Sequence, residues 1–421
     1  MPQKRALIIG GSMSGLLVAL MLRRQGWEAE IYERVGGALA GRGAGIVAQP
    51  SLIAHLETLG LDTRELGVPI ARRQLLDRAG RVVLTGHCPQ ILTAWEQVYR
   101  LLRDAFPVER YHHNRELASY EETSGGVGAR FADGSTAEGD ALIGADGLRS
   151  SVRQACLPAI VPLYAGYVAW RAILAEDALP AAIHSDLAEA MTFCLPAGEQ
   201  FLGYPVSGPD NDLRPGRRRY NVIWYRPANE TEELRSLLTD SHGVLHALSI
   251  PPPLIRREEI DAMRLAAERF LAPQCQALVW LIAEPLLQPI YDLESPRLAF
   301  GRIALIGDAG FVARPHVAAG VSKAADDSAA LAQALGGGDD VEVALRRYEA
   351  KRLPQNKRII ERARHLGAYL QATQSVEERT RSARHGVPNA VLEETAVVDF
   401  LYHQDASEPE SDDMPSQMTR S

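Results

Sequence analysis

The fold of this chain is decided at residues 7–17, which read LIIGGSMSGLL. An apolar run of strand type leads into a glycine turn, and the apolar spacing of residues 13–26 then predicts a helix that ends at Gly26. Residues 28–34, EAEIYER, alternate in polarity and predict a second strand. Together these segments predict a βαβ unit with parallel strands and a right-handed connection.

The glycine turn departs at one position from the G-x-G-x-x-G pattern of dinucleotide-binding loops, because Ser12 stands at the second glycine. Gly10 would make the tight turn, and Gly15 would let the helix pack closely on the strand. A serine is small, and its hydroxyl can donate to a phosphate oxygen. Glu33 follows about twenty residues later, where a carboxylate can accept both ribose hydroxyls of an adenosine. This register predicts a nucleotide site; the alternative is a chance glycine turn with a solvated Glu33.

Two later aspartates at predicted strand ends indicate which nucleotide to expect. Residues 140–153, DALIGADGLRSSVR, predict a buried strand that ends before Asp146. Residues 302–320, RIALIGDAGFVARPHVAAG, predict another that ends before Asp308. In a doubly wound sheet, ligands bind in the crevice at the carboxyl ends of the parallel strands. A flavin dinucleotide carries both an adenosine ribose and a ribitol, and Glu33 and Asp308 suit these two groups better than they suit an NAD-only site.

The composition is that of an ordinary globular protein and excludes several classes. The 421 residues include 46% hydrophobic and 23% charged side chains, and the length predicts more than one domain. The net charge of -8, without a basic stripe, argues against nucleic acid as a partner. With no signal peptide and no run of roughly 20 apolar residues, a cytoplasmic protein without a membrane partner is expected. Neither metal-ligand spacing nor a disulfide framework is formed by the four cysteines, Cys88, Cys156, Cys194 and Cys275.

The middle of the chain predicts a second, mostly antiparallel sheet. Its candidate strands are YVAWRAIL (167–174), FLGYPV (201–206) and RRYNVIWYR (218–226). The expected divisions are a discontinuous nucleotide-binding domain at 1–75, 95–160 and 270–335; a substrate-binding β-sheet domain at 76–94 and 161–269; a C-terminal helical segment at 336–375; and an irregular, partly disordered tail at 376–421.

The three motifs GGSMSG with Glu33, GADGLRSSVR and IGDAGFVARPHVAAG resemble those of the class A FAD-dependent aromatic hydroxylases. The resemblance extends from residue 1 to about residue 370. It implies an α/β fold in which a Rossmann-like FAD-binding domain of the p-hydroxybenzoate hydroxylase type carries an inserted antiparallel sheet. It also implies a monooxygenase that hydroxylates a small hydroxypyridine-like or phenolic ring, using FAD, NAD(P)H and O2 through a C4a-hydroperoxyflavin. A homodimer is implied as well.

The resemblance assigns cofactor-binding roles to individual residues. The pyrophosphate would lie against the loop of Gly10, Gly11, Ser12, Met13, Ser14 and Gly15. Glu33 and Arg34 would bind the adenosine, Asp308 the ribitol, and Asp146 the pyrophosphate region while positioning NAD(P)H. The isoalloxazine would lie near Arg42, Gly43, Ala44 and Gly45 and would face the helix start formed by Pro315, Ala318, Ala319, Gly320 and Val321.

Two positions depart from the family pattern. Ala318 replaces the first glycine of the usual P-x-x-G-x-G sequence, and Trp95 stands where many members carry an arginine that contacts FAD. Arg42 and Arg100 are candidates to replace that arginine.

The candidate catalytic residues are His316 and Tyr204, because hydroxylation requires a base near neutral pH to deprotonate the ring hydroxyl. His316 directly follows Pro315 at the flavin-facing turn; a capping or solvent-exposed histidine is the alternative. Aromatic strand residues more often pack than bind substrate, and Arg171 can equally pair with a nearby acid. The candidate substrate contacts are Trp170, Arg171, Trp224 and Tyr225.

Two other functions stay open at this point. One is a decarboxylating or Baeyer–Villiger-type member of the same fold. The other is a flavin-binding redox protein without monooxygenase turnover. A redox sensor usually has a reactive cysteine beside its flavin, and no cysteine adjoins any of the three motifs.

Overall fold

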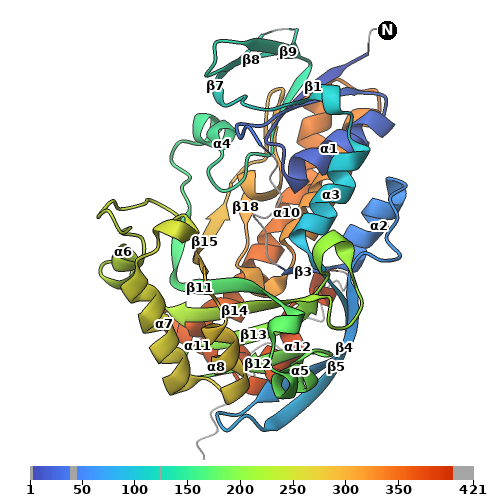
Figure 1. The fold of residues 1–421 in the computed structure, drawn as a ribbon. Helices are drawn as coiled ribbons and strands as arrows, with labels where there is room; N and C mark the ends of the chain where they lie inside the picture. The colour runs from blue at the N-terminus through green and yellow to red at the C-terminus, as the bar shows by residue number, and fades with distance from the viewer. Residues whose placement is uncertain (1–2, 38–44, 124, 402–421) are drawn as a thin grey trace, which may run out of the picture.

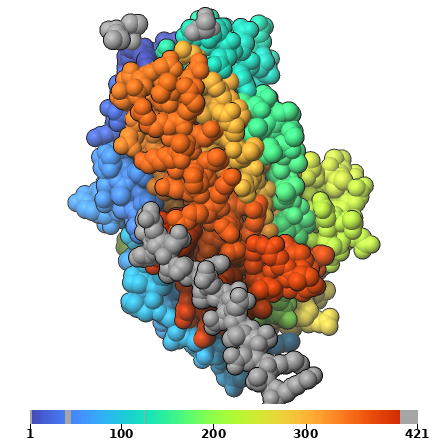
Figure 2. Space-filling view, turned by 180° about the vertical axis from the view of Figure 1, so that it is seen from behind, coloured from blue at the N-terminus to red at the C-terminus, as the bar shows by residue number. Residues whose placement is uncertain are grey.

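The computed structural model describes residues 3–37, 45–123 and 125–401. Its elements gather around two large sheets, one in the upper half and one in the lower half of the molecule (Figure 1). Helices α9 and α10 cover the back of the upper half, as Figure 2 shows from behind. Within these described ranges, no helix is both long and apolar enough to cross a membrane.

The upper sheet contains the predicted βαβ unit. Strand β1 pairs in parallel with β2 on one side and with β10 on the other, and β10 pairs in parallel with β17. The carboxyl ends of three sequence-distant strands therefore meet at one edge. In spatial order the strands are β16 (Ala299–Phe300), β17 (Ile303–Leu305), β10 (Ala141–Gly144), β1 (Arg5–Ile9), β2 (Glu28–Tyr32) and β6 (Tyr111–His112).

Helices pack on this sheet through apolar faces that belong to one continuous core. The hydroxyl of Tyr348 on α10 donates to the Leu305 carbonyl at 2.8 Å, which ties the long helix to the sheet. The helices of this half are α1 (Met13–Arg24), α2 (Pro50–Thr58), α3 (Trp95–Ala105), α4 (Ser151–Cys156), α9 (Gly320–Gly336) and α10 (Val341–Gly367). A small sheet at the top consists of β7 (Leu117–Glu122), β8 (Val127–Phe131) and β9 (Thr136–Gly139).

The lower sheet has nine strands and is mostly antiparallel, with one parallel pair between β12 and β4. In spatial order it comprises β18 (Phe311–Val312), β15 (Leu286–Glu294), β11 (Leu163–Ala175), β14 (Arg219–Pro227), β13 (Gln200–Val206), β12 (Ala190–Cys194), β4 (Val68–Leu76), β5 (Val82–Ala94) and β3 (Gly45–Ala48). The three candidate strands of the sequence are confirmed as β11, β13 and β14.

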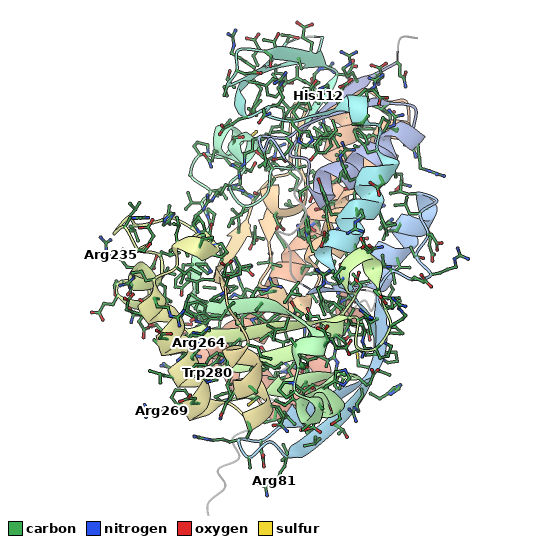
Figure 3. All side chains as sticks on the ribbon, viewed as in Figure 1. Arg81, His112, Arg235, Arg264, Arg269 and Trp280 are labelled. Carbon is green, nitrogen blue, oxygen red and sulfur yellow. The ribbon has the colours of Figure 1, made fainter. Side chains whose placement is uncertain are left out.

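One face of the lower sheet is covered by two helices that the sequence pattern did not indicate, α7 (Arg257–Phe270) and α8 (Pro273–Trp280). The guanidinium of Arg264 on α7 lies 5.4 Å from the centre of the Trp280 ring on α8, which links the two helices (Figure 3). The shorter helices α5 (Ala181–Leu187) and α6 (Glu233–Leu237) contribute Leu187 and Leu234 to the same core. The smaller of the two cavities described below lies on the opposite face of this sheet.

The expectation of an irregular chain from residue 376 is wrong as far as residue 394. Helices α11 (Val376–His385) and α12 (Pro388–Glu394) occupy this stretch. Ser375 and Glu378 form a capping box at the start of α11, a local signal that is independent of hydrophobic periodicity. Leu392 of α12 packs into the core of the lower sheet.

The elements cross two of the expected domain borders. Strand β4 of the lower sheet starts at residue 68, before the expected border at 75. Beyond residue 270, α8 packs on the lower sheet and β15 pairs within it. The division of the chain into separate domains stays a prediction.

Candidate active site

The glycine loop after β1 leaves no room for side chains at its three glycines. A Cβ on Gly10 would lie 2.5 Å from the Ala145 carbonyl oxygen, and Gly10 has a left-handed φ of +105°. A Cβ on Gly15 would lie 1.9 Å from the Gly10 carbonyl oxygen, and one on Gly11 would lie 2.1 Å from the Tyr111 hydroxyl. At Gly10 and Gly15 backbone is therefore packed against backbone, which keeps the loop tight enough for a pyrophosphate to approach it.

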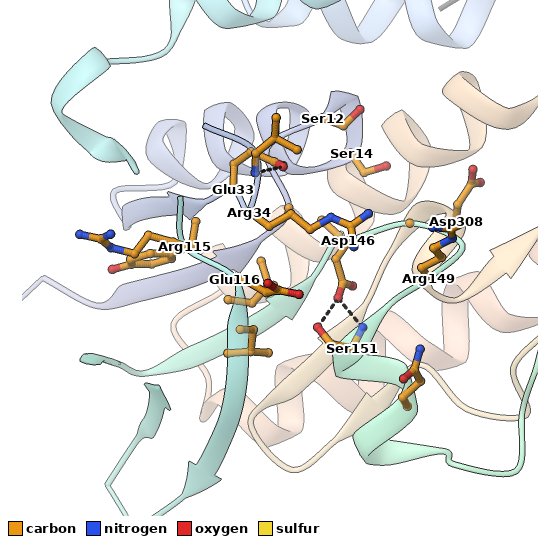
Figure 4. Close-up of a pocket in the computed structure, with 18 of the residues that line it drawn as sticks. Ser12, Ser14, Glu33, Arg34, Arg115, Glu116, Asp146, Arg149, Ser151 and Asp308 are labelled. Atoms are coloured by element: carbon orange, nitrogen blue, oxygen red, sulfur yellow. Dashed lines mark hydrogen bonds between the residues drawn. The ribbon is translucent and has the colours of Figure 1, made fainter. Parts of the chain in front are cut away.

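Ser12 is the N-cap residue of α1, yet its side chain makes no capping hydrogen bond. Ser12 and Ser14 both line the groove that the loop borders (Figure 4). The helix N-terminus adds unpaired N–H groups and a partial positive charge. The serine in place of glycine is thus compatible with a bound anion.

Glu33 directly follows β2 and lies beside the glycine loop. Its carboxylate accepts hydrogen bonds from the Gly11 N–H at 2.8 Å and from the Val35 N–H at 2.9 Å. These two bonds fix its orientation toward the groove, and its remaining lone pairs can accept from ribose hydroxyls.

A groove of about 460 Å³ runs along the carboxyl edge of the upper sheet. The predicted cofactor residues that line it are Gly10, Ser12, Ser14, Glu33, Arg34, Asp146 and Asp308. Gly11, Met13 and Gly15 shape the loop from beneath without lining the groove, and the Met13 side chain lies in the core. Trp95 does line it, stacked on Tyr99 with 5.0 Å between ring centres, whereas Arg100 pairs with Glu96 and Asp210.

Several other residues of this groove lie outside every motif of the sequence. Arg115 and Glu116 precede β7, Leu117 begins it, and Gln154 lies in α4. Arg149 and Ser151 also line it, and both lie within the quoted Asp-Gly motif.

Asp146 has one satisfied and one unsatisfied carboxylate oxygen. Its Oδ2 accepts from the Ser151 N–H at 2.7 Å and from the Ser151 hydroxyl at 3.0 Å (Figure 4). Its Oδ1 is buried and has no partner among the residues described. A buried carboxylate oxygen without a donor is costly, so a ligand that donates a hydrogen bond fits this position.

Asp308 lies where the large groove meets a second, smaller cavity, because it borders both. It follows Gly307, whose φ of +56° turns the chain after β17, and whose N–H donates to Asp327 at 3.0 Å. The Asp308 side chain is 53% exposed into this junction. An extended ligand can therefore pass from the groove to the cavity along Asp308.

The smaller cavity has a volume of about 190 Å³ and lies between the lower sheet and the start of α9. Apolar side chains make up much of its wall. The predicted residues that line it are Gly45, Arg171, Tyr204, Tyr225, Pro315, His316, Ala318, Gly320 and Val321. Ala319 is buried in a neighbouring core instead. Arg42, Gly43 and Ala44 lie outside the described residues.

His316 is 2% exposed and borders the smaller cavity. Its Nε2 lies 2.9 Å from the Tyr167 hydroxyl, and its Nδ1 is buried without a partner in the described chain. Burial, and then the positive charge of Arg314, lower the pKa of His316 to about 3. The ring is therefore neutral at physiological pH and has one nitrogen free to interact with a ligand.

Tyr204 and Arg171 have different hydrogen bonds from His316. The Tyr204 hydroxyl donates to the Gly45 carbonyl at 2.9 Å, and burial raises the pKa of Tyr204 to about 12. This geometry favours a role in holding the Gly45 backbone over acid–base catalysis. Arg171 donates through Nη1 to Gln288 at 2.7 Å, while its Nε is buried without a partner among the described residues.

The structure contradicts the expectation that Trp170 and Trp224 contact substrate. Side chains of a strand alternate between the two faces of a sheet. Tyr167 and Arg171 therefore share the face of the cavity, whereas Trp170 lies on the face that α7 and α8 cover. Trp224 points the same way, and its indole N–H donates to Glu199 at 2.8 Å.

The tail beyond residue 376 contributes to the cavity wall through Thr395 and Ala396. No motif in the sequence marked them. Their position depends on the Ala396 N–H, which donates to the His316 carbonyl at 2.7 Å.

The chain is similar to curated flavin hydroxylases along nearly its whole length. It is 32% identical to the 2,6-dihydroxypyridine 3-monooxygenase of Paenarthrobacter nicotinovorans, over 94% of this chain and 98% of that protein. It is 26% identical to the 6-hydroxynicotinate 3-monooxygenase of Bordetella bronchiseptica, over 88% of this chain and 93% of that protein. Residues 164–292 match a family model described as FAD binding domain-like.

Solved structures agree with this relationship. The 2,6-dihydroxypyridine-3-hydroxylase from Arthrobacter nicotinovorans matches with a TM-score of 0.83 and 32% identity, covering 89% of this chain and 94% of that chain. Klebsiella pneumoniae HpxO in complex with FAD and uric acid matches with a TM-score of 0.71 at 24% identity, covering 93% and 91%, which shows a common fold.

The site suits FAD on its own geometry. The glycine cradle accepts a pyrophosphate, Glu33 and the free Oδ1 of Asp146 can accept from hydroxyls, and the groove continues past Asp308 into a cavity that can receive part of a ring system. The role of each of these residues stays a prediction. The chain belongs to the class A FAD-dependent aromatic hydroxylases, and the predicted fold class, cofactor and monooxygenase activity are confirmed.

Proposed function

We propose that this monooxygenase hydroxylates a hydroxypyridine of the 2,6-dihydroxypyridine type. The observation that carries the proposal is the lining of the smaller cavity, which is largely apolar with a few polar side chains, as in sites for small rings. Within this wall, Arg171 and His316 are the polar side chains with a buried nitrogen that has no hydrogen-bond partner among the described residues, and each can bind an oxygen of a hydroxylated ring. The relative with 32% identity is named for this substrate, which supports the same choice.

FAD supplies oxygen activation and transfer when it is bound and reduced by NAD(P)H. The pKa of about 3 belongs to His316 in the empty cavity, and a ring oxyanion that forms beside Nδ1 raises it. With Nε2–H donated to the Tyr167 hydroxyl, Nδ1 then accepts the proton of the ring hydroxyl. The guanidinium of Arg171 stabilises the oxyanion that this transfer leaves on the ring. Apolar wall residues such as Met191, Leu202 and Ile223 exclude water.

A substrate screen tests the proposal. The purified protein is given NADH or NADPH with 2,6-dihydroxypyridine, 6-hydroxynicotinate or 3-amino-4-hydroxybenzoate, and cofactor oxidation is recorded with product mass. We expect 2,6-dihydroxypyridine to stimulate oxidation most strongly and to gain one oxygen atom. A product that has lost a carboxyl group, or a ring-expanded product, would instead indicate decarboxylating or Baeyer–Villiger chemistry. Slow oxidation with every ring would indicate a redox protein without this turnover.

The His316→Asn variant tests the base. Loss of a general base typically lowers the rate about 100-fold or more, so kcat should fall by at least that factor while FAD stays bound. A kcat close to that of the wild type would mean that His316 only shapes the cavity.

We also propose that the enzyme is a cytoplasmic homodimer. The four cysteines are free, as is usual in a reducing compartment, and the dimer follows from the family resemblance. Analytical ultracentrifugation of the purified protein tests the dimer, and fractionation of the source cells tests the location.

A further inference from the structure

Lys323 is a fully buried cation in the first turn of α9. Its side chain is 0% exposed, and its Nζ makes no hydrogen bond within the described residues. Two carboxylate oxygens, Oδ1 of Asp308 and Oδ2 of Asp327, each lie 3.9 Å from this nitrogen. These distances are too long for hydrogen bonds but short enough for strong electrostatic attraction in a buried setting. Burying an ammonium group without a hydrogen bond destabilises the fold, so a functional role for Lys323 is expected.

The two neighbouring carboxylates differ in how much they depend on Lys323. Asp327 is fully buried and already accepts hydrogen bonds from Gly307 N–H at 3.0 Å, Arg352 Nε at 2.7 Å and Asn356 Nδ2 at 3.1 Å. Asp308 accepts no hydrogen bond from the residues that the structure describes, and its side chain is exposed at the junction of groove and cavity. Lys323 is thus dispensable for Asp327, whereas among the described residues it is the cation that pairs with Asp308.

We propose that Lys323 is a positioning residue for FAD, which keeps Asp308 an ionised hydrogen-bond acceptor once the bound cofactor displaces water from it. The charge of Lys323 favours the ionised form of Asp308, whereas the charge of Asp327 disfavours it. An ionised carboxylate accepts stronger hydrogen bonds from hydroxyl groups than a protonated one does. The positive N-terminus of α9 acts in the same direction as the lysine.

Replacement of Lys323 by methionine tests this role, because it removes the charge and keeps the length of the side chain. Apoprotein is prepared from the full-length holoprotein, and FAD is titrated while flavin fluorescence is followed. The dissociation constant of FAD should rise about tenfold or more, as expected for the loss of one favourable charge contact. The Tm of the apoprotein should not fall, because Asp327 keeps its other partners and a buried charge is removed.

This pair of results separates positioning from structure. A lysine that only stabilised the fold would lower the Tm of the apoprotein and the affinity for FAD together, or prevent folding. The matched control is Lys351→Met on α10, since Lys351 is exposed and donates to Gln333 at 3.1 Å. The control should change neither quantity.

A double variant tests whether Lys323 acts through Asp308. Asp308→Asn should itself weaken FAD binding, and adding Lys323→Met should weaken it no further, because no carboxylate is left to keep ionised. Additive losses, an unchanged affinity in Lys323→Met, or a lowered Tm of the apoprotein would each overturn the proposal. These measurements use no ring substrate, so they stand apart from the choice of hydroxypyridine.

Discussion

The dinucleotide groove and the smaller cavity are built in opposite ways. The groove takes its shape from short motifs at strand ends, where the backbone of Gly10 and Gly15 is packed so closely that the residue type is fixed. The cavity is lined by residues that are spread along the sequence from Gly45 to Ala396. They come together because strand side chains alternate between the two faces of the sheet and because the tail packs against His316. Local sequence therefore specifies the groove, and the tertiary fold specifies the cavity.

The largest effect should come from breaking the groove. In Gly15→Val, the new Cβ would lie 1.9 Å from the Gly10 carbonyl oxygen, with backbone that cannot yield. We expect loss of FAD binding and destabilisation by about 4 kcal/mol or more, measured by flavin absorbance and urea unfolding. Gly128→Val on β8 is the control, because its Cβ would make an ordinary contact of 3.7 Å with Glu121. If Gly15→Val retained FAD, the close backbone packing at Gly15 would not be required for FAD binding.

The cavity should respond to acid through His316. Its folded pKa of about 3 lies below the ordinary value of 6.5, so the unfolded chain binds the extra proton. The stability contributed by His316 is therefore complete above pH 6.5 and is lost as the pH falls toward 3. Between pH 6.5 and 5 the free energy of unfolding should fall by about 2 kcal/mol from this group.

Urea unfolding of the wild type and of His316→Asn at pH 8, 6.5 and 5 measures this contribution. The variant should lose about 2 kcal/mol less than the wild type over the acid step. Burial also lowers the pKa of His365, to about 4. In His365→Asn the free energy of unfolding should therefore also fall less between pH 6.5 and 5 than in the wild type. Curves for His316→Asn that run parallel to the wild type would contradict the assignment.

A smaller effect is expected where the two regions meet, at Ala318. This alanine has a φ of 49° and a ψ of 34°, a left-handed conformation that favours glycine. The family pattern carries glycine there, so the backbone keeps its path although the residue differs. Ala318→Gly should stabilise the protein by about 1 kcal/mol, measured as a rise in Tm. Ala319→Gly, at a φ of -106°, should instead destabilise it by about 0.5–1 kcal/mol. Equal changes in both variants would refute this account.

The smallest effect on catalysis should come from the face of the lower sheet that lies away from the cavity. Trp170→Phe alters a side chain that packs under α7 and α8, so KM for the ring should change by less than about twofold. Its neighbour Arg171→Met alters the cavity itself and should raise KM clearly. Steady-state kinetics with the best ring substrate compares the two, and a large KM effect in Trp170→Phe alone would reverse the assignment of faces.

Sequence reasoning succeeded wherever chemistry depends on a local backbone shape. The strand, turn and helix around Ser12, the strand-end positions of Glu33, Asp146 and Asp308, and the turn before His316 could all be predicted from short stretches. It failed for Trp170 and Trp224, because an aromatic strand gives no sign of which face will be covered by α7 and α8. It also missed α11 and α12, whose mostly polar sequence hides their helical spacing although the capping box of Ser375 was present.

The sequence by itself determined the dinucleotide fold and the family, because glycine spacing and strand-end carboxylates act through the backbone and need few distant partners. Only the tertiary structure decided which side chains face the ring, how Ala396 of the tail lies against His316, and that Lys323 lies buried behind Asp308. The physical reason is range. Backbone turns are set by neighbouring residues, whereas burial, and with it the pKa of His316 and the cost of a charge at Lys323, depends on segments far apart in the chain.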